Sequence, residues 1–119
     1  MKAIAKIFVV VALIATNMGV TFAGPTRGPV AGVRRVNANS TMIFHETFRA
    51  GEVATVSIAG DGDTDLDLYV YDANGNLITR AIGLSDRETV SFTPFVTSTF
   101  RIEVRNLGSV WNEFAISMR

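Results

Sequence analysis

The stretch that decides the fold is GDGDTDLDLYVYD, residues 60–72, in which aspartates occupy every second position before an apolar alternation begins. Successive side chains of a β-strand point to opposite faces of the sheet. The apolar members of the stretch therefore share one face: Leu66, Leu68 and Val70. The polar and aromatic members share the other face: Asp65, Asp67, Tyr69 and Tyr71. This pattern predicts a strand with one face in a hydrophobic core.

Similar short runs recur from residue 41 onward, separated by turn signals such as Asn74-Gly75 and Pro94. The same alternation assigns a further set of apolar residues to the interior: Val56, Ile58, Val90, Phe92, Phe100, Ile102, Val104, Phe114 and Ile116. The sequence thus predicts an all-β fold, a single antiparallel β-sandwich with a jelly-roll-like arrangement of about seven to eight strands. In residues 41–48, the inward positions of Phe44 and Phe48 also place Glu46 inside, so we expect a bulge or an edge strand there.

The first 23 residues have the pattern of a secretory signal peptide. Lys2 and Lys6 precede an apolar run, residues 7–15, that is too short to span a bilayer, and the small residues Thr21 and Ala23 fit a cleavage site. We predict a mature chain that begins at Gly24, is secreted to the extracellular space or the periplasm, and has no membrane span after cleavage.

Residues 24–40 are rich in glycine, proline and small side chains and have no sustained period. We expect a flexible leader there, cut first by a protease near Arg34 or Arg35, followed by one domain from residue 41 to 119.

Charge and cysteine content exclude several classes of protein. Without Lys2 and Lys6, nine of the eleven basic residues remain against eleven acidic ones, a net charge of about −2. Such a balance gives no basis for nucleic-acid binding. The chain has no cysteine, so disulfides and thiolate metal sites are excluded.

The aspartates at positions 61, 63, 65 and 67 predict a calcium site. Two like charges about 7 Å apart on one strand face repel by roughly 2 kcal/mol at a surface-like dielectric, and a hard cation with oxygen ligands reverses that cost. The site differs from a helical calcium loop, because Leu66 occupies the position where that loop needs glycine. An equally weighted alternative is that Asp61, Asp63, Asp65 and Asp67 solvate a turn, block edge pairing and pair with Arg101 or Arg105.

Aromatic residues offer a second kind of site. Tyr69 and Tyr71 share a face and are candidate ligand-binding residues for a sugar or a peptide, as is Trp111 in the last turn. The alternatives are structural: cross-strand packing of the tyrosines, stacking of Arg101 and Arg105 on them, and closure of the core by Trp111. His45 is the only histidine, so neither a catalytic triad nor a zinc site has its usual residues, and we expect no enzyme.

The order of these pieces resembles the bacterial pre-peptidase C-terminal domain family. The resemblance rests on FRAGEVATVSIAGDGDTDLDLYVYDANGNLI, on ETVSFTPFVTSTFRIEVRN and on NEFAIS, and it covers nearly all of residues 41–118. It implies a β-sandwich accessory module of exported hydrolases, in some relatives with calcium as a structural ion and with collagen or polysaccharide as ligand. Because no peptidase accompanies the sandwich in this sequence, we expect a freestanding copy.

Together these features predict a secreted, non-catalytic accessory or binding module with calcium as a stabilising ion. Its expected partner is an extracellular protein or polysaccharide, or a secreted hydrolase that it assists. The alternative is a structural envelope or matrix protein without a discrete ligand.

Overall fold

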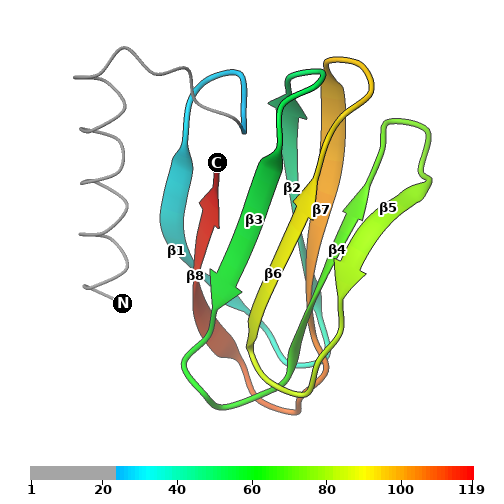
Figure 1. The fold of residues 1–119 in the computed structure, drawn as a ribbon. Helices are drawn as coiled ribbons and strands as arrows, with labels where there is room; N and C mark the ends of the chain where they lie inside the picture. Colours follow the sequence, from blue (N-terminus) through cyan, green and yellow to red (C-terminus); the bar gives the residue numbers. More distant parts are fainter. Residues whose placement is uncertain (1–23) are drawn as a thin grey trace.

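The structure, a computed structural model, describes residues 24–119, so the predicted signal peptide lies outside the described residues (Figure 1). The described chain forms eight strands: β1 Val30–Val36, β2 Thr41–Phe48, β3 Ala54–Ala59, β4 Leu66–Tyr71, β5 Leu77–Ala81, β6 Arg87–Phe92, β7 Ser98–Asn106 and β8 Asn112–Met118. Over this part of the chain, no helix has the length and apolar character needed to cross a membrane.

The strands form two four-stranded sheets that pack face to face, with orders β1-β8-β3-β6 and β2-β7-β4-β5. Every neighbouring pair is antiparallel. These orders arise when a long antiparallel hairpin folds over on itself, which is the topology of a jelly roll. The predicted fold class is therefore confirmed, including its strand number.

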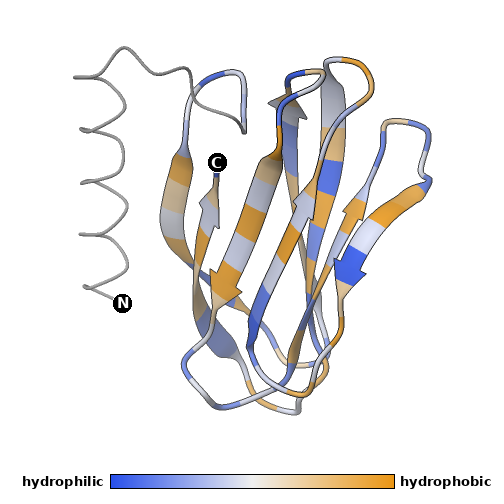
Figure 2. Ribbon diagram, in the orientation of Figure 1, coloured by the Kyte–Doolittle hydropathy of each residue, from blue (hydrophilic) through white to orange (hydrophobic). Residues whose placement is uncertain are grey.

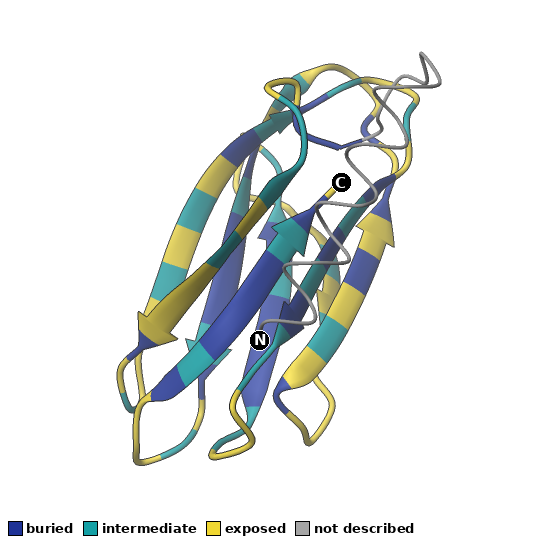
Figure 3. Cartoon of the chain, turned by 90° about the vertical axis from the view of Figure 1, so that its left-hand side faces the viewer, coloured by how far each residue is buried: buried dark blue, intermediate teal, exposed yellow. Residues whose placement is uncertain are grey.

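The core lies between the sheets and is built by the alternation that the sequence predicted. Apolar and polar bands alternate along the strands (Figure 2), and the inward residues are buried while most of their neighbours are partly or fully exposed (Figure 3). Asp67 and Glu103 are buried exceptions in the central strands β4 and β7. All the core residues named above from residue 56 to 116 are buried. Phe48, Phe92 and Phe100 form an aromatic cluster with ring centroids 5.0 to 5.9 Å apart. Edge-on and tilted aromatic contacts of this kind add about 0.5–1.5 kcal/mol each beyond burial.

Glu46 faces inward on β2, as the alternation requires, and is buried. The structure satisfies it without a bulge: β2 is an edge strand, and Arg27 from the preceding segment reaches over that edge. Arg27 Nε donates to Glu46 Oε1 at 2.8 Å, and its Nη2 pairs with Oε2. A buried carboxylate is tolerated because a guanidinium binds both of its oxygens.

The prediction of a flexible leader over residues 24–40 is wrong. Residues 30–36 form β1, which pairs with β8 along its whole length, and Val36 is buried. The segment before it is held by a bridge between Pro25 and Phe48 and by a hydrogen bond from the Thr26 amide to the Thr47 carbonyl. The sequence pattern is weak because most side chains of β1 face solvent, so its order comes from backbone pairing with a distant strand.

The loops gather at the two ends of the sandwich. We call one the aspartate end; it carries residues 37–40, 60–65, 82–86 and 107–111. The other, the cleft end, carries residues 49–53, 72–76 and 93–97. The sequence-predicted aspartates begin at the first end, and an apolar hollow lies at the second.

Candidate functional site

Asp61 holds the loop that connects β3 to β4. Its Oδ1 atom accepts a hydrogen bond from the Asp63 amide at 3.1 Å, and its Oδ2 atom accepts one from the Glu113 amide at 3.0 Å. Both carboxylate oxygens therefore accept hydrogen bonds from backbone amides, one of them on β8. Asp61 thus links the β3–β4 connection to the beginning of β8.

A second carboxylate, Asp86, lies beneath this loop and was not singled out by the sequence. It is buried, and its Oδ2 atom accepts hydrogen bonds from the Gly62 amide at 2.6 Å and from Asn112 Nδ2 at 3.0 Å. Asn112 is buried too and also donates to Thr64 Oγ1 at 3.1 Å. Gly60 is required here, because a β-carbon would lie 2.2 Å from Asp86 Oδ2. No local pattern predicts this network, since its members come from three separate segments.

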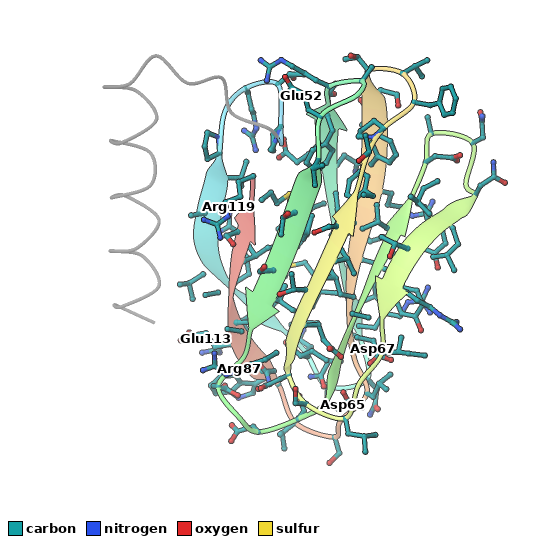
Figure 4. The ribbon with its side chains drawn as sticks, in the orientation of Figure 1. Glu52, Asp65, Asp67, Arg87, Glu113 and Arg119 are labelled. Carbon is teal, nitrogen blue, oxygen red and sulfur yellow. The ribbon has the colours of Figure 1, made fainter. Side chains whose placement is uncertain are left out.

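Asp65 and Asp67 form the remaining part of the predicted metal site, at the lower end of β4 in Figure 4. The Oδ1 atom of each is buried and has no hydrogen-bond partner among the described residues. Burial raises the pKa of the Asp67 carboxyl; the charges of Asp65 and Glu88 raise it further, and Arg105 opposes the shift. The pair is thus held at an electrostatic cost.

The fold uses the four aspartates in different ways. Asp61 is bonded to backbone amides, Asp63 is exposed, and Asp65 and Asp67 each have a buried oxygen without a partner among the described residues. Within residues 24–119 no group of three or more histidine, cysteine, aspartate or glutamate side chains is placed to hold a metal. Calcium takes six to eight oxygen ligands, so a site at these aspartates would need further oxygens from other loops, and calcium binding stays a prediction.

Tyr69 and Tyr71 lie on the outer face of the sheet β2-β7-β4-β5, where they pack with arginines of β7. The rings stack at 6.3 Å with an interplanar angle of 12°. The Arg105 guanidinium lies 3.8 Å from the centroid of the Tyr69 ring, and that of Arg101 lies 4.4 Å from that of Tyr71. The predicted arginine stacking is thus present. Because guanidiniums occupy positions that a stacked sugar ring would need, the tyrosines are not an open platform.

Glu103 lies between those arginines. Its Oε2 atom accepts from Arg101 Nε at 2.8 Å, and its Oε1 atom accepts from Arg105 Nε at 3.1 Å and Nη2 at 2.8 Å. Arg105 Nη2 also donates to the Tyr71 hydroxyl at 2.7 Å. We call this surface the arginine face: Tyr69, Tyr71, Arg80, Arg101, Glu103 and Arg105.

Trp111 lies far from the tyrosines, in the connection from β7 to β8 at the aspartate end. The Arg35 guanidinium is 3.9 Å from the centroid of its ring, and the side chain is half-exposed. The three aromatic residues predicted to bind a ligand therefore do not form a common site.

A cleft of about 290 Å³ at the cleft end is the site that the sequence analysis missed. It lies between the β4–β5 turn and the β6–β7 connection, and its apolar lining is Ile78, Phe92, Pro94, Phe95, Val96 and Phe100. Phe95 is 99% exposed and Val96 is 64% exposed. Two large apolar residues beside Pro94 in a turn, where polar residues are usual, were the signal available in the sequence.

One wall of the cleft is rigid. Asp72 Oδ1 accepts hydrogen bonds from the amides of Asn74 and Asn76 at 2.9 Å each, and Gly75 has φ +84°, which favours glycine. The Asn76 amide is the largest cause of a lowered pKa at Asp72. The hairpin turn expected at Asn74-Gly75 is confirmed, and it fixes the rim of the cleft.

Comparison with known proteins extends the fold assignment. No family model and no curated protein sequence matches the chain. Among solved structures, the chain is similar to a mitogen from Yersinia pseudotuberculosis, with a TM-score of 0.62, 11% identity, and 79% of this chain and 85% of that one covered. It is similar to the pre-peptidase C-terminal domain of a collagenase from Bacillus anthracis, with a TM-score of 0.57, 9% identity, and coverage of 77% and 88%.

A third similar structure is PliG of Aeromonas hydrophila, a periplasmic inhibitor of g-type lysozyme, with a TM-score of 0.54, 16% identity, and coverage of 84% and 93%. At these identities the similarity concerns the fold alone. The chain therefore shares the fold of the pre-peptidase C-terminal domain.

Proposed function

We propose that this chain is a non-catalytic binding module that acts outside the cytoplasm and binds a protein through its cleft end. The observation that carries the proposal is the exposure of Phe95 at the mouth of an apolar cleft. When a partner covers a solvent-exposed phenylalanine beside an apolar hollow, the burial of apolar surface stabilises the complex. Aromatic anchors at pockets dominate protein interfaces.

The alternatives named in the sequence analysis receive less support. A polysaccharide that stacks on Tyr69 and Tyr71 would have to displace Arg101 and Arg105. A structural protein without a ligand leaves the exposed Phe95 without a role. The similar structures include an inhibitor of an enzyme, a mitogen and an accessory domain, which supports a non-catalytic role outside the cytoplasm and a protein as partner.

Site-specific photocrosslinking tests the proposal. A photoreactive phenylalanine analogue at position 95 should give a discrete crosslinked protein band in the extracellular and envelope fractions of the cells that make this protein. The same analogue at position 84 is the matched control, because Leu84 is 95% exposed but lies at the aspartate end.

Competition completes the test. Excess unlabelled protein should abolish the band from position 95, whereas excess F95D protein should not. A partner that covers the cleft would have to desolvate the carboxylate at position 95, at a large cost. Equal labelling from positions 84 and 95, or equal competition by F95D, would contradict the proposal and favour the structural alternative.

A further inference from the structure

The arginine face is the part of the outer sheet surface where two cations, Arg101 and Arg105, are held by neighbouring side chains. Along β4 and β7, Tyr71 lies opposite Arg101 and Tyr69 lies opposite Glu103, which is bonded to both arginines. On the two outer strands, Arg80 of β5 lies opposite Tyr69, and His45 of β2 lies opposite Arg101. Basic or imidazole groups thus stand on three of the four strands of this sheet.

Arg101 is only partly used by the protein. Its Nε donates to Glu103, and its guanidinium plane lies over Tyr71, but neither terminal amino group donates a hydrogen bond within the described chain. The stack and the Nε bond hold the side chain in one conformation, so little entropy remains to be lost when an anion binds. A guanidinium held in this way offers two parallel N–H groups to a carboxylate.

Arg80 provides a second cation. It is exposed, and neither a hydrogen bond nor an ion pair to another residue of the described chain engages it. Arg80 lies opposite Tyr69 of β4, and Arg101 lies two residues along β7 from Glu103, the other partner of Tyr69. The backbones of the two arginines are therefore roughly 12 Å apart at the usual strand and residue spacings. His45 is exposed on the far side of Arg101 and adds a ring N–H donor.

The charge balance of the face favours an anion. Arg80, Arg101 and Arg105 carry three positive charges, and the one carboxylate among them, Glu103, is buried beneath two of those arginines. Asp67 lies opposite Arg105, toward the aspartate end, where Asp61, Asp63, Asp65 and Asp86 also lie. The face is therefore locally positive on a chain whose net charge is slightly negative.

We propose that the arginine face binds an acidic polysaccharide, with two carboxylates of one polymer chain held by Arg101 and Arg80. An extended polymer can lie along the outer face of the sheet and reach both cations, whereas protein interfaces are usually dominated by aromatic anchors in pockets. The bidentate geometry available at Arg101 selects a planar carboxylate. The arginine face is separate from the cleft end, so the outcome of its test does not depend on whether a protein binds at the cleft end.

Affinity measurement with polygalacturonate, a linear polymer of carboxylated sugars, tests the proposal. The wild-type protein should bind polygalacturonate and not neutral dextran, and binding should weaken as salt rises because the contacts are exposed ion pairs. R101Q should lower the affinity about tenfold, the usual effect of losing a charge-assisted hydrogen bond. R101K should stay close to R101Q, since an ammonium keeps the charge but cannot make the paired contact.

R80Q and R87Q complete the series. R80Q should also weaken binding severalfold, and because the Arg80 side chain is exposed and makes no hydrogen bond or ion pair within the described chain, this variant tests the site even where R101Q lowers stability. Arg87 is an exposed arginine on β6 of the opposite sheet (Figure 4), so R87Q removes the same charge elsewhere and should leave the affinity unchanged.

Three outcomes would overturn the proposal: no binding of polygalacturonate at low salt, equal losses in R101Q and R87Q, or equal binding of polyglutamate. The last result would assign the face to acidic peptides.

Discussion

Asp67 is a carboxylate that the fold buries to 6% exposure while leaving its Oδ1 atom without a hydrogen-bond partner among the described residues. Its raised pKa means that the folded state holds the proton more tightly than the unfolded state. Its contribution to stability therefore falls as pH rises from the unfolded pKa, about 3.9, through the folded one, and stays unfavourable at neutral pH.

The variant D67N should accordingly melt higher than wild type at pH 7, by about 4 °C if removal of the buried charge is worth about 1 kcal/mol. The gain should shrink as pH falls into the range where Asp67 is protonated. D63N, at an exposed position in the same acidic run, is the control and should change little. Thermal melts of all three proteins at several pH values check this; a lower melting temperature for D67N at pH 7 would show that its contact with Arg105 outweighs its burial.

At the scale of single elements, β1 is the strand whose order is least visible in the sequence. Because β1 pairs with β8, trypsin should leave Arg34 and Arg35 intact while the sandwich is folded. V36D places a carboxylate at a buried position of this strand and should destabilise the fold by about 3 kcal/mol or more, since the charge has no partner in the core.

V33D, at a half-exposed position of β1, should leave stability within about 0.5 kcal/mol of wild type. Urea unfolding and timed trypsin digestion measure both effects. Rapid cleavage at Arg34 or Arg35 in the wild-type protein would contradict the pairing and restore the expectation of a flexible leader.

The contrast between β1 and β4 shows how far sequence reasoning reaches. The period-two run of residues 66–71 predicted β4 and its core face, because Leu66, Leu68 and Val70 are buried while Tyr69 and Tyr71 on the other face are partly open to solvent. The burial of Asp67 on that other face was not predicted. In β1 only Val36 is buried, so no period appears. The network around Asp61 could not be predicted for a similar reason: Asn112 and Asp86, which bind the backbone of its loop, come from distant segments that no local pattern reveals.

At the scale of the whole molecule, the dependence of stability on calcium is a prediction that melting experiments can test. A folded-state calcium site raises the free energy of unfolding by about 2.7 kcal/mol at one hundred times its dissociation constant, and each 1 kcal/mol shifts the melting temperature by about 4–8 °C in a domain of this size. We expect any such rise to depend on Asp65 and Asp67, the two residues of that run with unpartnered buried oxygens among the described residues.

Melting in chelator and in millimolar calcium decides the question. A rise that D67N removes and D63N keeps would support calcium at Asp65 and Asp67. Superimposable curves for the wild-type protein would favour the alternative that the aspartates solvate a turn and shape a loop.

The strand order also governs when the chain can fold. In the sheet β1-β8-β3-β6, the eighth strand lies between the first and the third, so β1 has no neighbour until residues 112–118 have been synthesised. Pairings between segments so distant in sequence form slowly, because the entropy cost of closing a long loop comes before the contacts that offset it. The sheet β1-β8-β3-β6 can therefore be completed only after β8, the last strand of the described chain, has been synthesised, and until then β1 has an unpaired edge on both sides.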